Sequence, residues 1–211
     1  MAGLIGALVV AAAIGSKEDG GQAMTGVDRT LLEAGLSLML TAAAVVGSFS
    51  FTSDFDTRSF HRRILMFQRG AAFTGRAASI TVAALVTGAI VGVFFGLSGE
   101  LVANLWHVSA PAVLAFAAMA GIGSLWGFAI GSLIRNHFLS LFVVPLSLVL
   151  PAALASRLGQ FADLLFPNLV TDWVNQWALG SVKLDSFAGA VTWLACSLGG
   201  AYWVFLKRDL T

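Results

Sequence analysis

Residues 53–76, SDFDTRSFHRRILMFQRGAAFTGR, separate two long apolar segments and carry five of the twelve Lys and Arg residues. Read at the period of an α-helix, spacings of four, seven and eleven residues place apolar side chains on one face: Phe60, Ile64, Phe67 and Ala71. Basic side chains lie away from that face: Arg58, Arg62 and Arg69. The stretch therefore predicts a basic amphipathic helix over about residues 54–70.

Such a helix between two apolar segments has two interpretations. It can be a cytoplasmic loop that follows the positive-inside rule and lies against lipid headgroups. It can also be a docking element that lays its apolar face into a groove on a soluble partner. Position alone favours the loop, and the resemblance described below favours docking.

The composition predicts an integral membrane protein. The chain has 211 residues, of which 58% are hydrophobic and 11% charged, with a mean hydropathy of +0.87. A soluble domain carries about 25% charged residues, so this chain has too few to cover a surface in water. The net charge of +1 gives no case for nucleic acid. A single cysteine, Cys196, and three isolated histidines predict neither a disulfide framework nor a zinc site.

Uncharged windows predict an all-α chain with six transmembrane helices, because a spanning helix needs about 20 apolar residues. The spans fall at about 1–16, 31–52, 77–98, 111–133, 137–156 and 186–206. The first is short, and the competing interpretation is a signal peptide. No Lys or Arg precedes its apolar run, so we favour a first span with an absent or brief lead-in.

The charges of the loops predict the orientation. Eight Lys and Arg residues lie on the side of the basic helix and four on the other side. The positive-inside rule then places both termini and the basic helix in the cytoplasm.

Two of the spans carry glycines at four-residue spacing. The third contains Gly88, Gly92 and Gly96, and the fourth contains Gly123, Gly127 and Gly131. Glycines on one face let two helix backbones approach closely in lipid. We expect these two helices to pack tightly on each other, and the alternative is a seam between two copies.

The segment after the fifth span, about 158–184, is too polar to cross and too apolar for a solvated loop. Its pattern predicts a short extracytoplasmic hairpin of two helices broken at Pro167. Trp173 and Trp177 are expected at the membrane interface.

Three stretches resemble the type-2 ABC exporter permeases, membrane subunits that work with a separate ATP-binding subunit. The first begins at Thr52-Ser53-Asp54, continues through Ser59, Arg62 and Gln68-Arg69, and ends at Arg76 before a span. The second is GSLIRN at residues 131–136, which ends the fourth span. The third is the hairpin between spans five and six, followed by the carboxyl end FLKRD at residues 205–209. The likeness covers nearly the whole chain.

The resemblance implies a transport subunit in a bacterial-type cytoplasmic membrane, with no catalytic, cofactor or metal site of its own. No G-x4-G-K-[ST] phosphate loop occurs, so ATP and Mg²⁺ would belong to the partner. The implied partners are two ATP-binding subunits, a second copy or a related permease, and membrane lipid. The helix after the second span would couple to the ATPase through Asp54, Phe55, Arg58, Ser59, Phe60, Arg62, Arg63, Ile64, Phe67 and Arg69.

The later spans have no charge in their middles, which favours a lipid, a hydrophobic peptide or a drug-like amphiphile as substrate. Glu33, near the outer end of the second span, is expected to be an interfacial carboxylate. An alternative of another class is an intramembrane serine protease of the rhomboid kind, because GLSG at residues 96–99 matches its GxSG. The last span carries no histidine to act as the base, so we interpret the match as chance. A non-catalytic immunity or scaffold protein is a further alternative.

Overall fold

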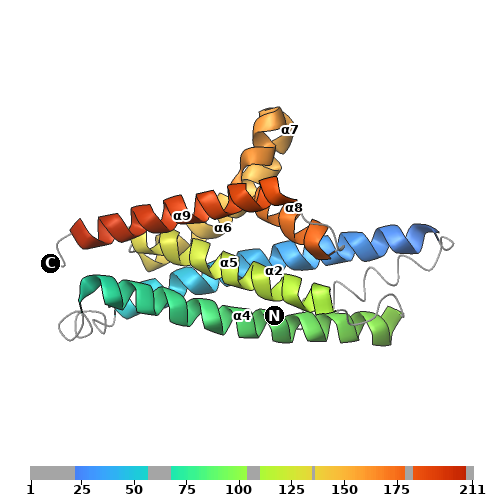
Figure 1. The fold of residues 1–211 in the computed structure, drawn as a ribbon, viewed down its shortest axis with the longest axis horizontal. Coiled ribbons are helices and arrows are strands. Elements are labelled where there is room, and N and C mark those ends of the chain that lie inside the picture. The colour runs from blue at the N-terminus through green and yellow to red at the C-terminus, as the bar shows by residue number, and fades with distance from the viewer. Residues whose placement is uncertain (1–21, 57–67, 104–109, 135, 179–182, 208–211) are drawn as a thin grey trace.

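The computed structural model describes residues 22–56, 68–103, 110–134, 136–178 and 183–207. Over these ranges the chain contains no strand, which confirms the all-α prediction. The helices are α2 (Gln22–Asp56), α4 (Arg69–Ala103), α5 (Ala110–Ile134), α6 (His137–Ala153), α8 (Phe166–Ala178) and α9 (Leu184–Lys207), with two short helices, α7 (Ala155–Leu158) and η2 (Gly159–Leu164). The end of the bundle where α4 and α6 begin and α9 ends is called the inner end, and the opposite end is called the outer end (Figure 1). The two words name ends of the molecule and not sides of a membrane.

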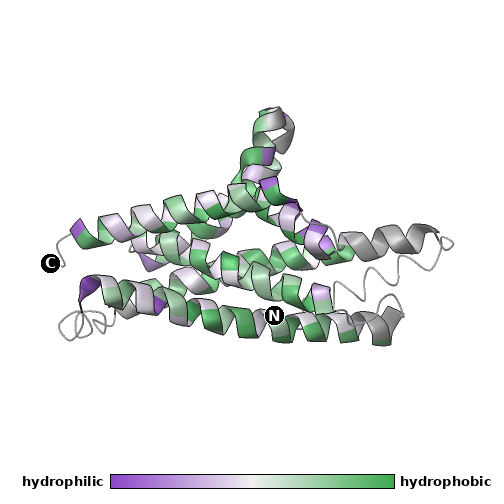
Figure 2. Cartoon of the chain, viewed as in Figure 1, coloured by the Kyte–Doolittle hydropathy of each residue, from purple (hydrophilic) through white to green (hydrophobic). Residues whose placement is uncertain are grey.

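Four helices are long and apolar enough to cross a membrane, as expected of an integral membrane protein. The apolar lengths are Thr30–Ser53 in α2, Arg69–Ser98 in α4, and the whole of α5 and α9. Figure 2 shows the apolar residues along these helices. They correspond to the predicted second, third, fourth and sixth spans, while the predicted first span lies outside the described residues. Helix α4 begins eight residues before the boundary that was predicted at residue 77. The prediction counted only uncharged residues, whereas a helix can continue beyond its uncharged part.

Helix α5 is the centre of the bundle, and α2 and α4 pack on different faces of it (Figure 1). The glycines of α5 face α2. A Cβ added at Gly123 or Gly127 would overlap the backbone carbonyl of Leu40 or Ala44, and one at Gly131 would lie 2.9 Å from the Cα of Ser48. These three glycines therefore let the α2 and α5 backbones touch at three points that are about one helical turn apart. We call this contact the α2–α5 seam.

The glycines of α4 face the other side of α5. A Cβ added at Gly88 would lie 2.8 Å from the Cα of Ala117, and one at Gly92 would lie 3.0 Å from the Cα of Val113. The predicted close packing of α4 on α5 is therefore present. The two sets of glycines do not meet, however, because the α5 set is occupied by α2.

Aromatic side chains join four helices near the inner end. Phe51 of α2, Phe73 of α4, Phe128 of α5 and Phe205 of α9 are all buried. The ring centroid of Phe128 lies 5.3 Å from that of Phe51 and 4.9 Å from that of Phe73, both in edge contact. We call these four residues the inner aromatic cluster. Among the aromatic residues that end α9, Phe205 is therefore a core residue, whereas Trp203 is exposed beneath the Lys207 ammonium at 4.3 Å.

Helix α6 covers residues 137–153 of the fifth span that was predicted at about 137–156. Helix α6 has 17 residues and would reach about 25 Å, which is less than the ~30 Å hydrocarbon core. Trp126 of α5 contacts both α6 and α8. The Trp126 indole Nε1 donates to Ser147 Oγ of α6 at 3.1 Å, and its ring stacks on Phe166, the first residue of α8, with centroids 4.0 Å apart. Helices α6 and α8 thus contact the same level of α5, and neither is among the four long apolar helices.

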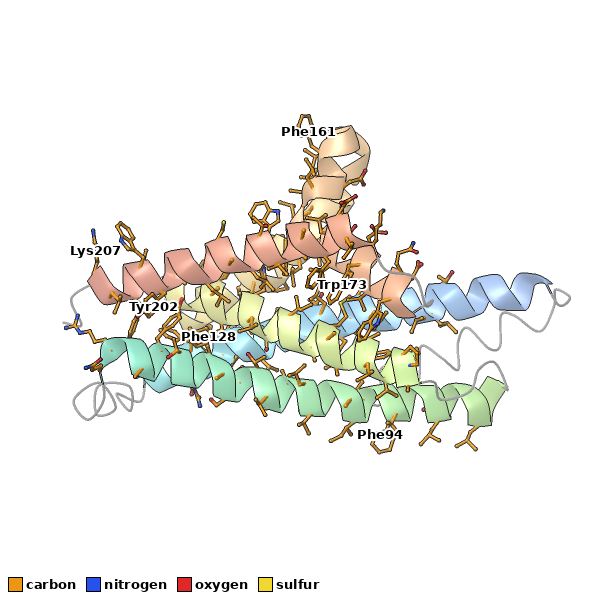
Figure 3. The ribbon with its side chains drawn as sticks, in the orientation of Figure 1. Phe94, Phe128, Phe161, Trp173, Tyr202 and Lys207 are labelled. Atoms are coloured by element: carbon orange, nitrogen blue, oxygen red, sulfur yellow. The ribbon has the colours of Figure 1, made fainter. Side chains whose placement is uncertain are left out.

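The residues between α6 and α8 project from the bundle as an arm made of α7 and η2, with Phe161 at its tip (Figures 1 and 3). Phe161 is 73% exposed and Leu164 is 62% exposed. The arm ends at Leu165, whose backbone is extended, and Pro167 lies in the first turn of α8, where a missing N–H is tolerated. The helix break that was predicted at Pro167 thus falls two residues earlier. Trp173 packs on Trp177 and on Phe187 of α9.

Candidate functional site

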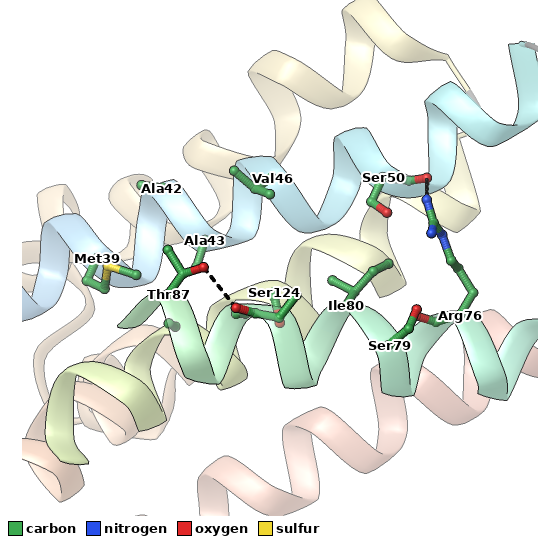
Figure 4. Close-up of a pocket in the computed structure, with 13 residues that line it drawn as sticks. Met39, Ala42, Ala43, Val46, Ser50, Arg76, Ser79, Ile80, Thr87 and Ser124 are labelled. Atoms are coloured by element: carbon green, nitrogen blue, oxygen red, sulfur yellow. Dashed lines mark hydrogen bonds between the residues drawn. The ribbon is translucent and has the colours of Figure 1, made fainter. Parts of the chain in front are cut away.

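A groove of about 400 Å³ lies between α2 and α4 and has α5 as its floor (Figure 4). Most of its lining is apolar and small. The lining residues are Met39, Ala42, Ala43, Val46 and Ser50 from α2, Arg76, Ser79, Ile80, Ala83, Ala84 and Thr87 from α4, and Ala120 and Ser124 from α5.

The groove exists because α2 and α4 each pack on α5 and meet one another at only a few points. Glycines hold each of them against α5, as described above. Where α2 and α4 face each other, alanines provide too little volume to close the gap, as at Ala42 and Ala83. The result is a groove that is open along one side and has α5 as its floor.

Three hydroxyl groups of the groove lining donate hydrogen bonds within their own helices: those of Ser79, Thr87 and Ser124. Thr87 Oγ1 donates to the carbonyl of Ala83 at 2.9 Å, and Ser124 Oγ donates to the carbonyl of Gly121 at 2.8 Å. A hydroxyl that returns its hydrogen bond to its own backbone presents little unmet polarity to a neighbour. The walls therefore suit a hydrocarbon chain better than a polar molecule.

Arg76 provides the one charge in the lining, at the inner end of the groove. Its guanidinium reaches from α4 to α2, where Nη2 donates to the carbonyl of Ser50 at 3.2 Å (Figure 4). The side chain is half-buried. The groove thus combines an apolar length with a guanidinium at its inner end that is hydrogen-bonded to α2.

The predicted coupling residues are only partly covered by the described structure. Asp54 and Phe55 belong to the last turns of α2, which ends at Asp56, and Arg69 is the exposed first residue of α4. The ends of the predicted helix over 54–70 are therefore continuous with the two long helices. The other predicted residues lie outside the described residues: Arg58, Ser59, Phe60, Arg62, Arg63, Ile64 and Phe67.

A second, polar cavity of about 600 Å³ lies toward the outer end, between α2, η2, α8 and α9. Four acids and one lysine line it: Glu33, Asp163, Asp172, Asp185 and Lys183. Lys183 Nζ donates to Asp172 Oδ2 at 2.8 Å, and Ser186 Oγ donates to the same oxygen at 2.7 Å. The hydrogen bond from Lys183 is the main cause that lowers the pKa of Asp172, and the same bond raises the pKa of Lys183. Glu33 thus lies in a polar cavity, in line with the expected interfacial carboxylate.

The residues that a rhomboid-type protease would need are not brought together in the described structure. Ser98 is near the outer end of α4, where its Oγ donates to the carbonyl of Phe94 at 2.7 Å. His137, the only histidine among the described residues, begins α6 at the inner end, and its Nδ1 lies 2.8 Å from Thr52 Oγ1. The described residues also contain no group of three or more His, Cys, Asp or Glu that could hold a metal ion.

No protein-family model, no curated protein and no solved structure matches this chain. Among the residues of the groove, the sequence pattern indicated Arg76, the basic residue before a predicted span, but not the alanines. An alanine that lines a groove cannot be told by its sequence from one that faces a neighbouring helix.

Proposed function

We propose that this chain is the transmembrane permease subunit of an ABC exporter. It moves a hydrophobic or amphipathic substrate, such as a lipid, a peptide or a drug-like molecule, with ATP hydrolysed by a separate subunit. The sequence resemblance is one support. A second is the arrangement of α2 and α4.

The observation that carries the proposal is that one segment connects both walls of the groove. Residues 57–68 join the end of α2 to the start of α4, and those two helices form the walls. Both walls are continuous helices of 35 residues. A load applied to the connecting segment would therefore be transmitted along two rigid helices and would change the width of the groove.

The sparse contact between α2 and α4 also supports a moving part. Transporters of many kinds alternate access by rocking one group of helices against another. Two helices that pack on a common partner, and only lightly on one another, can tilt without breaking a direct interface. In the proposal, two ATP-binding subunits act on two copies of this chain, or on one copy and a related permease, in a bacterial-type cytoplasmic membrane.

Co-purification with the ATP-binding subunit tests the coupling segment. Burial of one aromatic side chain contributes about 2–3 kcal/mol, and interface energy concentrates in a few anchors. Phe60→Ala with Phe67→Ala should therefore release the ATPase and uncouple ATP turnover from transport in liposomes. Arg62→Ala is the matched control and should retain the ATPase, because an exposed ion pair contributes roughly 0–1 kcal/mol.

Two outcomes would contradict the proposal. Full retention of binding and coupled turnover in the double alanine variant would reduce the stretch to a positive-inside loop. The second concerns topology. In a Cys196→Ala background, cysteines at Ser59 and Gly21 should react from opposite sides of the membrane. Reaction of both from the outside would place the basic stretch where no ATPase can reach it.

A further inference from the structure

We propose that the arm made of α7 and η2 is the surface through which two copies of this chain meet. The arms of the two copies lie antiparallel across a two-fold axis, so that Arg157 of each copy pairs with Asp163 of the other. The inference does not rest on the proposed function, because it concerns how two copies meet and not what they move.

The arm leaves the bundle far from the ends of the neighbouring helices. At its base, the carbonyl of Leu164 accepts a hydrogen bond of 2.9 Å from Trp193 Nε1 of α9, and Phe166 stacks on Trp126 of α5. Trp193 lies nine residues from the outer end of α9, and Trp126 lies eight residues from the inner end of α5. At 1.5 Å per residue, these separations are about 14 Å and about 12 Å. Both helices are long enough to cross a membrane, so the base of the arm lies at the level of the hydrocarbon core.

Lipid does not suit the backbone or the charges of the arm. Helix η2 is a 3₁₀ helix, Gly159 has a φ of +54°, and Leu165 is extended, so the arm lacks the continuous hydrogen bonding of an α-helix. Irregular backbone at membrane depth occurs only where protein or water covers it. Arg157 and Asp163 are exposed on the arm, and charged side chains at this depth almost always face protein or a water-filled cavity.

Water does not suit the arm either, because its tip is apolar. Phe161 is at the tip, and Leu158 is also exposed (Figure 3). The bundle does not cover these side chains, since α7 and η2 pack mainly on one another and on the adjoining ends of α6 and α8. A protein surface that offers both apolar contact and opposite charge satisfies the whole arm, whereas neither lipid nor water does.

The arm is complementary to itself. Along the chain it carries a cation, an exposed aromatic ring and an anion, at Arg157, Phe161 and Asp163. Neither charge forms an ion pair within the described part of its own chain. In a two-fold interface, residue i of one copy contacts residue j of the other, and the reverse. Two antiparallel arms therefore form two ion pairs with the two Phe161 rings between them, and an axis along the membrane normal keeps both arms at one depth.

Cysteine cross-linking of the full chain in membranes tests the position of the arm. In a Cys196→Ala background, which removes an exposed thiol, Phe161→Cys should give a disulfide-linked dimer on oxidation. Phe94→Cys is the matched control, because Phe94 is also an exposed phenylalanine but lies on α4, and it should give little dimer. Equal yields from the two variants would overturn the proposal. A dimer that forms without a cross-link at Phe161 would also overturn it, while leaving the proposed function standing.

Charge reversal tests the two ion pairs. Arg157→Asp and Asp163→Arg each place like charges opposite one another, which is strongly unfavourable at an interface. We expect each variant to lower the association constant in liposomes by about tenfold or more, as measured by energy transfer between two labelled populations. The variant with both substitutions should recover the wild-type constant, because opposite charges face each other again. Lys207→Asp reverses a charge away from the arm and should leave association unchanged; an equal loss there would overturn the proposal.

Mixing the two single variants distinguishes a contact between copies from a contact within one copy. A copy with Arg157→Asp and a copy with Asp163→Arg place opposite charges at both contacts, so mixed dimers should form although neither variant associates with itself. A loss of association that mixing does not restore would overturn the proposal, because the charges would then act within one copy or on its folding.

Discussion

Helix α2 has two sides that differ in what they meet. Toward α5, the glycines of the α2–α5 seam allow backbone to touch backbone, and nothing else fits between them. Toward α4, alanines face a gap of about 400 Å³. Glycine and alanine are both small residues, yet they have different effects here. The seam glycines of α5 lie directly against α2 and close that interface, whereas the alanines of α2 that face α4 leave a groove. The comparison separates a rigid side of the molecule from a side that can accept a ligand.

The largest expected effect comes from breaking the seam. Gly127→Leu places a side chain where even a Cβ would overlap the Ala44 carbonyl, so the α2 and α5 backbones must separate. Overpacking costs about 1–3 kcal/mol in soluble cores, and we expect this variant to exceed that range because backbone atoms are in the way. Thermal unfolding in detergent measures the loss. Gly199→Leu is the control, because Gly199 has open space around it. Equal loss in both variants would contradict the seam.

The inner aromatic cluster gives the next largest effect. Phe128→Ala removes a fully buried ring that contacts Phe51 and Phe73. Phe→Ala costs about 3–5 kcal/mol in soluble cores, and we expect the lower end because lipid already solvates the ring after unfolding. Phe94→Ala, at a 60% exposed position of α4, should change the stability little. If Phe94→Ala destabilised the protein as much as Phe128→Ala, the cluster would not be the inner anchor of the bundle.

On the side of α4 that lines the groove, replacement of a small residue by leucine should have only a small effect on stability. Ala83→Leu adds volume where the structure has space, so we expect the free energy of unfolding of the delipidated protein to change by less than about 0.5 kcal/mol. Differential scanning fluorimetry of this variant beside Gly127→Leu makes the comparison direct. Destabilisation of similar size in the two variants would show that the groove is as tightly packed as the seam.

The smallest effect is the pH dependence of the Asp172–Lys183 ion pair. The pKa of Asp172 is lowered in the folded state by the hydrogen bond from Lys183, so the pair contributes stability above the ordinary value of 3.8 and loses it in more acidic solution. The pKa of Lys183 is raised, so the contribution is present below 10.5 and is lost in more alkaline solution. The difference in melting temperature between wild type and Asp172→Asn should therefore be largest near neutral pH and vanish at both extremes. A difference that does not vary with pH would exclude the ion pair as its cause.

The sequence predicted the helical architecture well, because apolar windows of about 20 residues leave few alternatives in a membrane. It also predicted that glycines would mark close helix contacts. The predicted packing of α4 on α5 is present through Gly88 and Gly92, but the sequence did not indicate that Gly123, Gly127 and Gly131 contact α2, because periodicity gives the face of a helix and not the partner of that face. The small residues opposite the glycines, such as Ala117 and Ser48, carry no distinguishing pattern of their own.

The fifth span shows a second limit. Residues 137–156 are uncharged and long enough to cross, yet α6 ends at Ala153 and α8 resumes the contact with α5 at Phe166. Apolar length alone does not record that Trp126 stacks on a residue forty positions later. The candidate groove was missed for a related reason. The groove is present because α2 and α4 make few contacts with each other, and the number of such contacts is known only from the three-dimensional structure.

The central position of α5 has a consequence for biosynthesis. Helices α2 and α4 leave the ribosome before α5. They meet one another at only a few points, and each packs mainly on a face of α5, which is not yet made. Until residues 110–134 enter the membrane, the surfaces of α2 and α4 that pack on α5 have no α5 to contact. We infer that the bundle cannot close during synthesis until α5 arrives and clamps both earlier helices in one step. A chain truncated before residue 134 would offer those surfaces to quality-control proteases, whereas one extended past it would not.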